Sequence, residues 1–506
     1  MRNVFSPQMS IGQPDIADIK IDVSSRDDIP TILLGLQHIY TTTPLRDAVF
    51  KILEEIAPTK SDGEETKVVS IHKGRPGMDQ WSILVLGSLR VGLNADYDRI
   101  LELANQHNTL REMLGLGCFD SHKRYHLQTL KDNIKLFTPE IMGRISTEVI
   151  RAGYQLLDLD IHLLIRGRCD SFVLKTNVHF PTDISLLFDA TRVMIRICVK
   201  WDKQHALPGW RQHQHNLRQF KNLYRKLQKL KHSTSKNEDI KTVKALEIKQ
   251  AYQDYIDLAG FYLARVKAGI LTLKNDHKIP EVLLTDLHTF SLHADRQIDQ
   301  IRRRAIHDEK IPHDEKVFSL FQPHTEWISK GKAGVPVELG VKVCILEDQH
   351  QFILHHQVMQ KKTDDQVAVQ MVGEAKMRFP DLNACSFDKG FHSPENQIAL
   401  KEQLEQVVLP RKGKLSQLAR AKEQTEPFIK ARHAHSAVES AINALEVHGL
   451  DMCPDHGIDG FKRYVALAVV ARNIHRIGDI LWKQEQLREQ RKKKYLGRSP
   501  PCKLAA

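Results

Sequence analysis

Residues 384–391 read Ala-Cys-Ser-Phe-Asp-Lys-Gly-Phe, an apolar run that ends in Asp388 before a Lys-Gly pair. A short apolar run bounded by turn residues predicts a buried strand, with Asp388 at its C-terminal end. A second β-rich stretch, residues 169–174, reads Cys-Asp-Ser-Phe-Val-Leu and carries Asp170. If the two strands are neighbours in one sheet, the two carboxylates meet.

A third carboxylate, Glu439, lies on a predicted helix in which residues 436–442 read Ser-Ala-Val-Glu-Ser-Ala-Ile. Two strand-borne aspartates and a later helix-borne glutamate can converge on a pair of divalent cations. Mg²⁺ takes oxygen ligands, usually one or two carboxylates together with water and phosphate oxygens. A two-metal site activates an oxygen nucleophile and stabilises the leaving oxygen in phosphoryl transfer. The alternative for each residue is an ordinary surface carboxylate.

The patterns around these residues predict strands and helices in a definite order. A β-rich stretch at 171–178 is followed by a helix from Asp183 to about Trp201, and residues 202–312 show only long helical patterns. Without that helical insertion, the order is strand, helix, two strands, helix, strand, helix, strand and helix, which is an α/β fold. Besides the Glu439 helix, the later elements are expected at 335–347, 352–359, 364–379, 382–388, 393–406, 407–409 and 461–484.

This order divides the chain into six segments. An all-α unit precedes the first strand, and a long helical insertion interrupts the α/β core. The segments are an N-terminal arm (1–75), the helical domain (76–165), the first part of the core (166–201), the helical insertion (202–312), the second part of the core (313–485) and a basic tail (486–506).

The composition narrows the class of protein. The chain has 506 residues and a formal net charge of +12, which favours a polyanionic partner such as nucleic acid; the alternative is a basic protein without one. Its seven cysteines include no Cys-x-x-Cys pair, which argues against structural zinc and fits a reducing compartment. No apolar stretch suits a signal peptide, and no run of about 18 apolar residues suggests a membrane span.

Basic side chains gather in three places that could contact phosphates. In the insertion they lie beside an apolar stripe at helical spacing, so they form a cationic face. The alternative in each place is a solvated charged surface. We select Arg218, Lys221, Arg225 and Lys229 in the insertion, Lys330 and Lys332 before the second strand, and Arg411, Lys412 and Lys414 after the short strand.

Four stretches resemble motifs of one known family. Residues 170–183 resemble the first-aspartate region of bacterial insertion-sequence transposases of the DDE class, and residues 388–396 are similar to their second-aspartate motif. The helix at 435–445, followed by His-Gly-Leu, resembles their glutamate motif, and residues 324–332 match a further block. The resemblance covers roughly residues 75–485, and the combination is more specific than any one piece.

The resemblance implies a ribonuclease-H-like mixed sheet flanked by helices, an all-α N-terminal domain and a large helical insertion after the first strand. It implies a DNA transposase that binds insertion-sequence ends, cleaves DNA with two Mg²⁺ ions (Mn²⁺ can substitute) and transfers the cut strand to target DNA. Asp170, Asp388 and Glu439 become the catalytic metal ligands, with Asp388 bridging both ions. Residues 76–165 become the DNA-binding domain for the terminal inverted repeats; a packing or dimerisation unit is the alternative.

The chain departs from the family next to the glutamate. Related enzymes carry an arginine one turn before it and a lysine about two turns after it, whereas these positions hold His435 and Glu446 here. Arg432 lies one turn earlier still. We therefore assign Arg432 and His435 to DNA contact.

The resemblance also implies partners. These are double-stranded DNA, as terminal inverted repeats and as target, and further copies of the chain, because two element ends must be joined; a homodimer is the simplest such assembly. No membrane partner is expected, and the expected location is the bacterial cytoplasm, in association with the nucleoid. Two alternatives stay open: a catalytically silent repressor that binds the element ends, and a ribonuclease-H-like nuclease without strand transfer.

Overall fold

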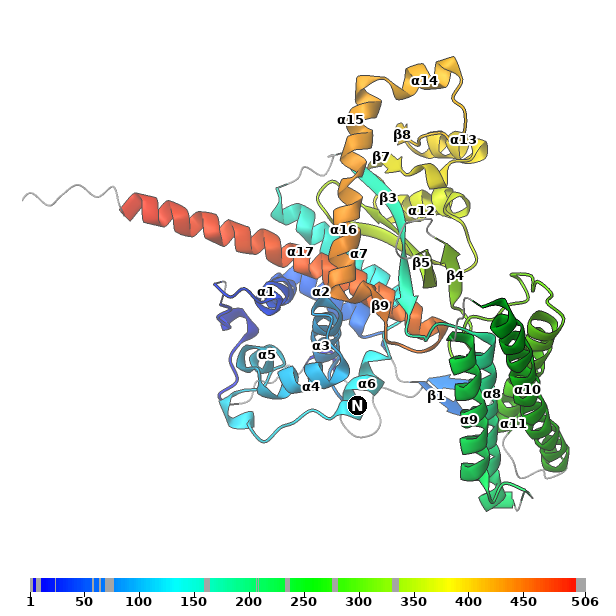
Figure 1. Cartoon of the computed structure of the whole chain (residues 1–506). Coiled ribbons are helices and arrows are strands. Elements are labelled where there is room, and N and C mark those ends of the chain that lie inside the picture. The colour runs from blue at the N-terminus through cyan, green and yellow to red at the C-terminus, as the bar shows by residue number, and fades with distance from the viewer. Residues whose placement is uncertain are drawn as a thin grey trace, which may run out of the picture. The chain divides into compact units, whose positions relative to one another are not determined.

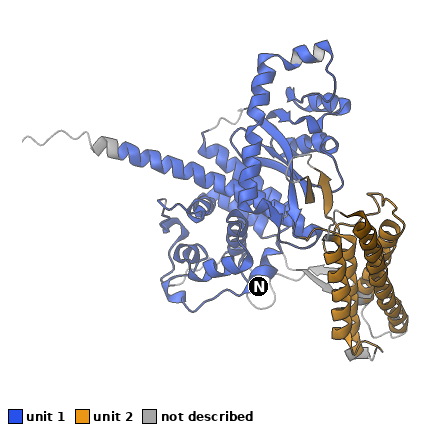
Figure 2. Cartoon of the chain, viewed as in Figure 1, with its two compact units in different colours: residues 1–177, 340–506 blue, residues 178–339 orange. Residues whose placement is uncertain are grey.

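The chain folds into two compact units, one made of residues 1–177 and 340–506 and the other of residues 178–339 (Figure 2). Each unit has its own apolar core. The second unit is thus an insertion in the chain of the first. The computed structural model describes residues 3–5, 11–22, 24–56, 59–62, 65–68, 77–158, 164–205, 207, 209–232, 237–274, 281–329 and 336–496.

The first unit begins with helices, several of which start at a capping side chain. The carboxylates of Asp27, Asp79 and Asp96 each accept a hydrogen bond from a backbone N–H in the first turn that follows. Such caps satisfy donors that a helix start leaves unpaired. The elements are α1 (Asp28–Thr41), α2 (Thr43–Leu53), a hairpin of β1 (Thr59–Asp62) and β2 (Glu65–Val68), α3 (Gln80–Gly92), α4 (Tyr97–Gln106), α5 (Asn108–Met113), α6 (Leu127–Ile134) and α7 (Pro139–Leu156).

A long C-terminal helix, α17 (Gly457–Leu496), packs against α1, α3 and α7 (Figure 1). Two glycines allow α1 and α17 to cross closely. A Cβ on Gly35 would lie 2.2 Å from the carbonyl oxygen of Ile474, and a Cβ on Gly478 would lie 1.9 Å from that of Thr31. A larger residue at either position would force the helices apart, so the glycines fix where they cross.

The sheet is built around β3 (Ile165–Thr176). On one side β3 pairs antiparallel with β5 (Val337–Glu347), and β5 pairs antiparallel with β6 (Ile353–Met359). On the other side β3 pairs parallel with β7 (Leu382–Phe387) and, farther along, with β9 (Met452–Cys453). β7 pairs parallel with β8 (Gln406–Val408). Counting β4 (Glu326–Ser329), this is a mixed open sheet of seven strands.

The N-terminal helices and the sheet share one core. The ring of Phe352, at the start of β6, occupies the space where a Cβ on Gly153 of α7 would lie, at 2.2 Å. Tyr154 of α7 donates a hydrogen bond of 2.6 Å to the carboxylate of Asp348 beside β5. The later strands alternate with α12 (Asp364–Arg378), α13 (Pro394–Gln403), α14 (Gln417–Glu423), α15 (Glu426–His435) and α16 (Ala437–Leu445).

The second unit consists mainly of long helices around an aromatic core. Phe220 and Tyr255 are both fully buried, and their rings stack with centroids 4.7 Å apart. Trp201 and Trp210 are also buried in this core. The helices are α8 (Asp183–His205), α9 (His213–His232), α10 (Glu238–Lys274) and α11 (Glu281–Ile301), which continues into a π-helical turn at Arg302–Ile306.

The prediction of an α/β fold with a mixed sheet is confirmed at this level. The segment boundaries differ from those expected. Residues 1–75, expected to form an arm, contain α1 and α2, whose apolar faces belong to the first core. Helix α8, expected in the core segment 166–201, lies in the second unit because it packs with α9, α10 and α11. Within the described residues, no helix has both the length and the apolar character that a membrane crossing requires.

Candidate active site

Asp170 and Asp388 lie at the same level of two neighbouring strands. β3 and β7 are parallel, and their last paired residues are Cys169 and Phe387. Asp170 is the next residue of β3, and Asp388 directly follows the end of β7, so the register sets the two residues side by side. The chain turns away at Asp388 into a 3₁₀ turn, residues 389–391, where Phe391 packs its buried ring 5.6 Å from that of Phe387.

The sheet has a gap beside Asp170. β7 pairs with β3 only as far as Cys169, and β9 pairs with it again only from Lys175. On that side of β3, residues 170–174 have no strand partner among the described residues. Helix α16 contacts β3 and carries Glu439 to the same region (Figure 1). The three predicted carboxylates therefore come from two strands and a helix that adjoin one another.

The electrostatics of Asp170 show that these carboxylates act on one another. Burial, the largest effect, raises the pKa of Asp170 to about 6, and the negative charges of Asp388, Asp364 and Glu439 add to the rise. A 2.7 Å hydrogen bond from the backbone N–H of Ser171 opposes it. Asp170 is thus a partly buried carboxyl whose pKa is raised further by the charges of three other carboxylates.

The three carboxylates are donors of the type that a hard divalent cation takes. Within the part of the chain that the structure describes, no three His, Cys, Asp or Glu side chains already stand at coordination spacing. However, Asp388 and Glu439 are exposed, and their carboxylates have no hydrogen-bond or ion-pair partner among the described residues. A cation among them would relieve the repulsion at Asp170, and carboxylate oxygens are the ligands that Mg²⁺ prefers.

His435, in the last turn of α15, lies near the three carboxylates Asp170, Asp388 and Glu439, which we call the triad. Its Nδ1 is 3.0 Å from the hydroxyl of Ser386, a buried residue of β7. Burial lowers the pKa of His435, while the charges of Asp388 and Glu439 act in the opposite direction. The predicted DNA contact His435 therefore adjoins the triad, whereas Arg432 is exposed one turn earlier on the same helix.

Sequence reasoning missed a fourth carboxylate, Asp364. Its oxygens accept a 2.7 Å hydrogen bond from Ser171 and a 3.0 Å bond from the ammonium group of Lys342. Because side chains alternate along a strand, Ser171 and Asp364 lie on the opposite face of the sheet from Asp170. In the sequence, Asp364 carries only the signal of a helix start, since its partner Lys342 lies on a distant strand.

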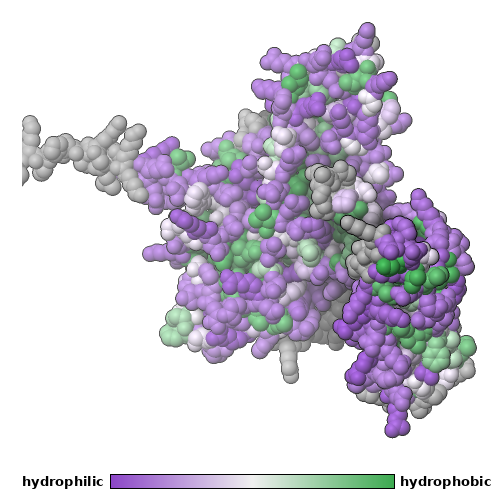
Figure 3. Space-filling model, in the orientation of Figure 1, coloured by the Kyte–Doolittle hydropathy of each residue, from purple (hydrophilic) through white to green (hydrophobic). Residues whose placement is uncertain are grey.

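The predicted basic loop lies against the turn that follows Asp388. The ammonium group of Lys412 donates a 2.8 Å hydrogen bond to the carbonyl of Gly390. Arg411 and Lys412 also act electrostatically on His392, whose pKa is lowered first by burial and then by these charges. Lys414 is exposed on the same loop. The surface over the neighbouring α13 and α15 is mainly hydrophilic (Figure 3).

The four predicted residues of the insertion form a stripe on α9. Arg218, Lys221, Arg225 and Lys229 are all exposed, at spacings of three and four residues that place them on one helical face. They belong to the second unit, whereas Asp170, Asp388 and Glu439 belong to the first. Lys330 and Lys332 lie outside the described residues.

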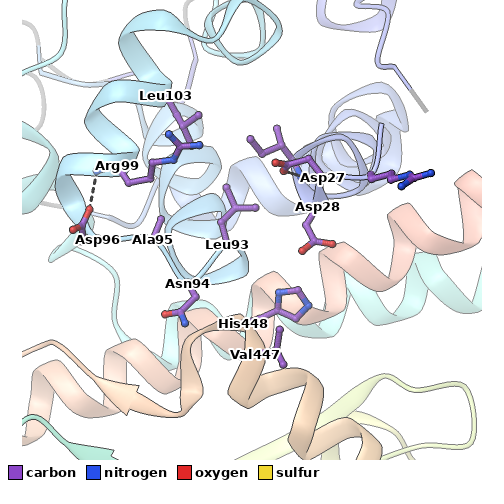
Figure 4. Close-up of a pocket in the computed structure, with 12 residues that line it drawn as sticks. Asp27, Asp28, Leu93, Asn94, Ala95, Asp96, Arg99, Leu103, Val447 and His448 are labelled. Carbon is purple, nitrogen blue, oxygen red and sulfur yellow. Dashed lines mark hydrogen bonds between the residues drawn. The ribbon is translucent and has the colours of Figure 1, made fainter. Parts of the chain in front are cut away.

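The helix that carries Glu439 is anchored at its C-terminal end. The carbonyl of Gly92, the last residue of α3, can only accept, so Nδ1–H of His448 donates to it at 2.6 Å. The hydroxyl of Tyr464 donates to the carbonyl of Gly449, which has the left-handed φ of +101°. A cavity of about 590 Å³ opens at this joint, with Asp28 and His448 on its wall (Figure 4). These hydrogen bonds connect the turn after α16 to α3 and α17.

Comparison with known proteins gives no relative: no family model, curated protein or solved structure matches this chain. Function is therefore inferred from the geometry of the site.

Proposed function

We propose that the chain is a DNA transposase of the DDE class, which binds insertion-sequence ends and catalyses Mg²⁺-dependent strand cleavage and strand transfer. The observation that carries this proposal is the pair Asp170 and Asp388, set side by side by the register of β3 and β7, with Glu439 within electrostatic reach. Three carboxylates from two strands and a helix are the donor set that a two-metal phosphoryl-transfer site needs.

The finer fold is part of the proposal. We propose that the sheet is ribonuclease-H-like. Four strands (β3 to β6), a helix, a strand, a helix and a strand follow one another along the chain, with the helical insertion after the first strand. Apart from β4, this matches the order that the sequence patterns predict, and a helical insertion after the first strand is what the family resemblance implies. Both support the assignment.

In the proposed mechanism, Asp170, Asp388 and Glu439 would hold two Mg²⁺ ions, for which Mn²⁺ can substitute. The ions supply activation of the attacking oxygen and stabilisation of the leaving oxygen. In the first step a water oxygen bonds to phosphorus as the bond from phosphorus to the 3′-oxygen breaks, which frees a 3′-hydroxyl. In the second step that 3′-oxygen bonds to a target phosphorus and a target 3′-oxygen leaves. Both steps are displacements at phosphorus, so one set of carboxylates serves both.

The proposed partner is double-stranded DNA, both as terminal inverted repeat and as target. Lys412 and its neighbours on the loop at 411–414 bring positive charge to the turn after Asp388, and the stripe on α9 offers a second cationic surface. Cationic side chains of this kind supply the salt-dependent part of DNA affinity. Two DNA ends must be held together, so an assembly of at least two copies is part of the proposal.

The test is cleavage and joining of a labelled DNA end, taken from the sequence that flanks the gene, in Mg²⁺. Wild type should give nicked and joined products, and Asp388→Asn should bind the end but give neither. Glu395→Gln is the matched control, because Glu395 is an exposed carboxylate on α13, seven positions from Asp388.

The alternatives predict different products. Equal cutting by wild type and Asp388→Asn would refute the assignment of the triad. Tight binding of the end without cutting by either protein would favour the end-binding repressor. Cutting without joining would favour a nuclease that lacks strand transfer.

A further inference from the structure

The pairing of β3 with β7 stops one residue short of both aspartates. The last pair is Cys169 with Phe387, so among the described residues no strand pairing joins Asp170 to Asp388. Carboxylates that hold two Mg²⁺ ions need a fixed separation, because Mg²⁺ demands near-ideal octahedral geometry. The separation of these two carboxylates therefore depends on contacts outside the sheet.

The start of helix α12 supplies such a contact on the side of Asp170. The carboxylate of Asp364 accepts a 2.7 Å hydrogen bond from the hydroxyl of Ser171. The backbone N–H of Ser171 in turn donates a 2.7 Å hydrogen bond to the carboxylate of Asp170. Asp364 thus holds the residue that itself holds the carboxylate of Asp170.

The same carboxylate lies against the turn that follows Asp388. A Cβ on Gly390 would lie only 3.1 Å from Oδ2 of Asp364, so this glycine lets the turn approach the carboxylate closely. Asn396 of α13 holds the turn as well. Its side-chain amide donates to the carbonyl of Phe391 at 2.9 Å and to a carbonyl in the first turn of α12 at 2.6 Å. The start of α12 therefore bridges the ends of both strands.

Lys342 of β5 holds the carboxylate of Asp364 from a second strand. Its ammonium group lies 3.0 Å from one oxygen of Asp364 and 3.2 Å from the other. The two side chains are only 26% and 19% exposed, and charge-assisted hydrogen bonds are stronger than neutral ones. Ser171, Lys342 and Asp364 thus join β3, β5 and α12 on the face of the sheet opposite to Asp170.

We propose that Asp364 is a positioning residue of the metal site. Through Ser171 and Gly390, it fixes the separation of the two aspartate carboxylates that hold the cations. The inference rests on the proposed function, and it gives Asp364 no contact with the cations or with DNA. Groups that hold metal ligands in place typically change metal affinity or activity about tenfold to a hundredfold when they are removed.

The test is Mn²⁺ binding by the whole chain without DNA, measured by the electron paramagnetic resonance signal of the free ion. Asp364→Ala should raise the Kd for Mn²⁺ about tenfold, because the ligands lose their fixed separation. Ser171→Ala should cause part of this loss. Adding Ser171→Ala to Asp364→Ala should cause no further loss, because the hydrogen bond between the two residues is already absent.

The Mg²⁺ dependence of cleavage gives a second readout. Asp364→Ala should need about tenfold more Mg²⁺ for half-maximal cleavage, by the same loss of affinity. Its rate at saturating Mg²⁺ should stay near that of wild type, because Asp364 touches no reacting group. Asp364→Asn, which keeps the size of the side chain and an oxygen for Ser171, should lose less than Asp364→Ala.

Glu395→Ala is the matched control, because it also removes a carboxylate from the first turn of a helix, and it should bind Mn²⁺ as wild type does. An equal loss in this control would overturn the inference, and so would a Kd that Asp364→Ala leaves unchanged. Additive losses from Asp364→Ala and Ser171→Ala would overturn it too, since the two residues would then act by separate routes.

Urea unfolding shows whether each variant folds. If Asp364→Ala does not fold, Asp364→Asn and Ser171→Ala take its place, and an unchanged Kd in both would overturn the inference. The inference and the proposed function fail in different ways. Mn²⁺ binding and cleavage by wild type, with no change in Asp364→Ala, would overturn the inference alone. A wild type that neither binds Mn²⁺ nor cleaves DNA would overturn the proposed function, and the inference with it.

Discussion

Asp170→Asn should stabilise the first unit at neutral pH while abolishing the proposed reaction. Burial and neighbouring carboxylates raise the pKa of Asp170 from 3.8 to about 6. Each pKa unit is worth about 1.36 kcal/mol, so the ionised carboxylate costs about 3 kcal/mol of folding free energy above pH 6. Asparagine keeps the oxygen that accepts from the backbone N–H of Ser171 and removes the charge.

The gain has a defined pH window. Well below pH 3.8 the carboxyl is protonated in both the folded and the unfolded chain, so Asp170→Asn and wild type should be equally stable there. As pH rises from about 4 to about 6, the unfolded chain ionises first and wild type loses stability relative to the variant. Above pH 6 the difference in unfolding free energy between Asp170→Asn and wild type should stay at about 3 kcal/mol. This difference can be measured by urea unfolding between pH 4 and pH 8, with tryptophan fluorescence as the signal.

The matched control is Glu395→Gln, which removes an exposed carboxylate and should show no such window. A variant that is less stable than wild type at pH 8 would refute the reasoning, because it would mean that Asp170 has a stabilising partner. A gain of equal size at pH 4 and pH 8 would also refute it, since the effect would then not come from ionisation.

Three other features of the molecule can be tested in the same way. Mg²⁺ should raise the melting temperature of wild type at neutral pH, because it binds only the folded site, and should raise that of Asp170→Asn less; an equal rise would place the ion elsewhere. Gly478→Ala should destabilise the crossing of α1 and α17 by about 1–3 kcal/mol in urea unfolding, because its Cβ would lie 1.9 Å from the carbonyl oxygen of Thr31. Gly373→Ala is the control, with only a side-chain oxygen at 3.7 Å. Glutamine at all four positions of the α9 stripe should weaken DNA binding and reduce the salt slope by about 0.9 for each DNA phosphate that the variant no longer neutralises, whereas an unchanged slope would mean that the stripe is only solvated.

The sequence predicted the bounds of β7 well and those of β3 less well. The apolar run predicted at 382–388 forms β7 at Leu382–Phe387, because a buried parallel strand is apolar on both faces. β3 begins at Ile165, earlier than the predicted 171, since its first residues, with Arg166 and Gly167 among them, have no strand pattern and are held by pairing with β7. β9 has only two residues and exists only as a partner of β3.

The sequence indicated helix α1 only weakly, and it gave no signal for the contacts of Asp364 and His435. The buried face of α1, at Ile29, Ile32, Leu33 and Leu36, has helical spacing and could have been recognised within the range expected to be an arm. The contacts of Asp364 could not have been predicted from the sequence, because they join it to Ser171 and Lys342, which lie on separate strands. The pairing of His435 with Ser386 likewise joins residues 49 positions apart in the chain.

The stability cost at Asp170 is itself a reason to expect a cation. Because burial raises the pKa of Asp170, we expect its ionised form to destabilise the fold at neutral pH, and asparagine of nearly the same shape to remove that cost. Packing alone therefore gives no reason for a carboxylate to be here, and still less for Asp388 to stand beside it at the same level of the neighbouring strand. Active sites commonly hold such destabilising charges, because the ligand rather than the fold neutralises them. Among the described residues, no strand pairs with residues 170–174 on the side of β3 where β7 and β9 lie, which leaves room beside Asp170 for the cation of the proposed function.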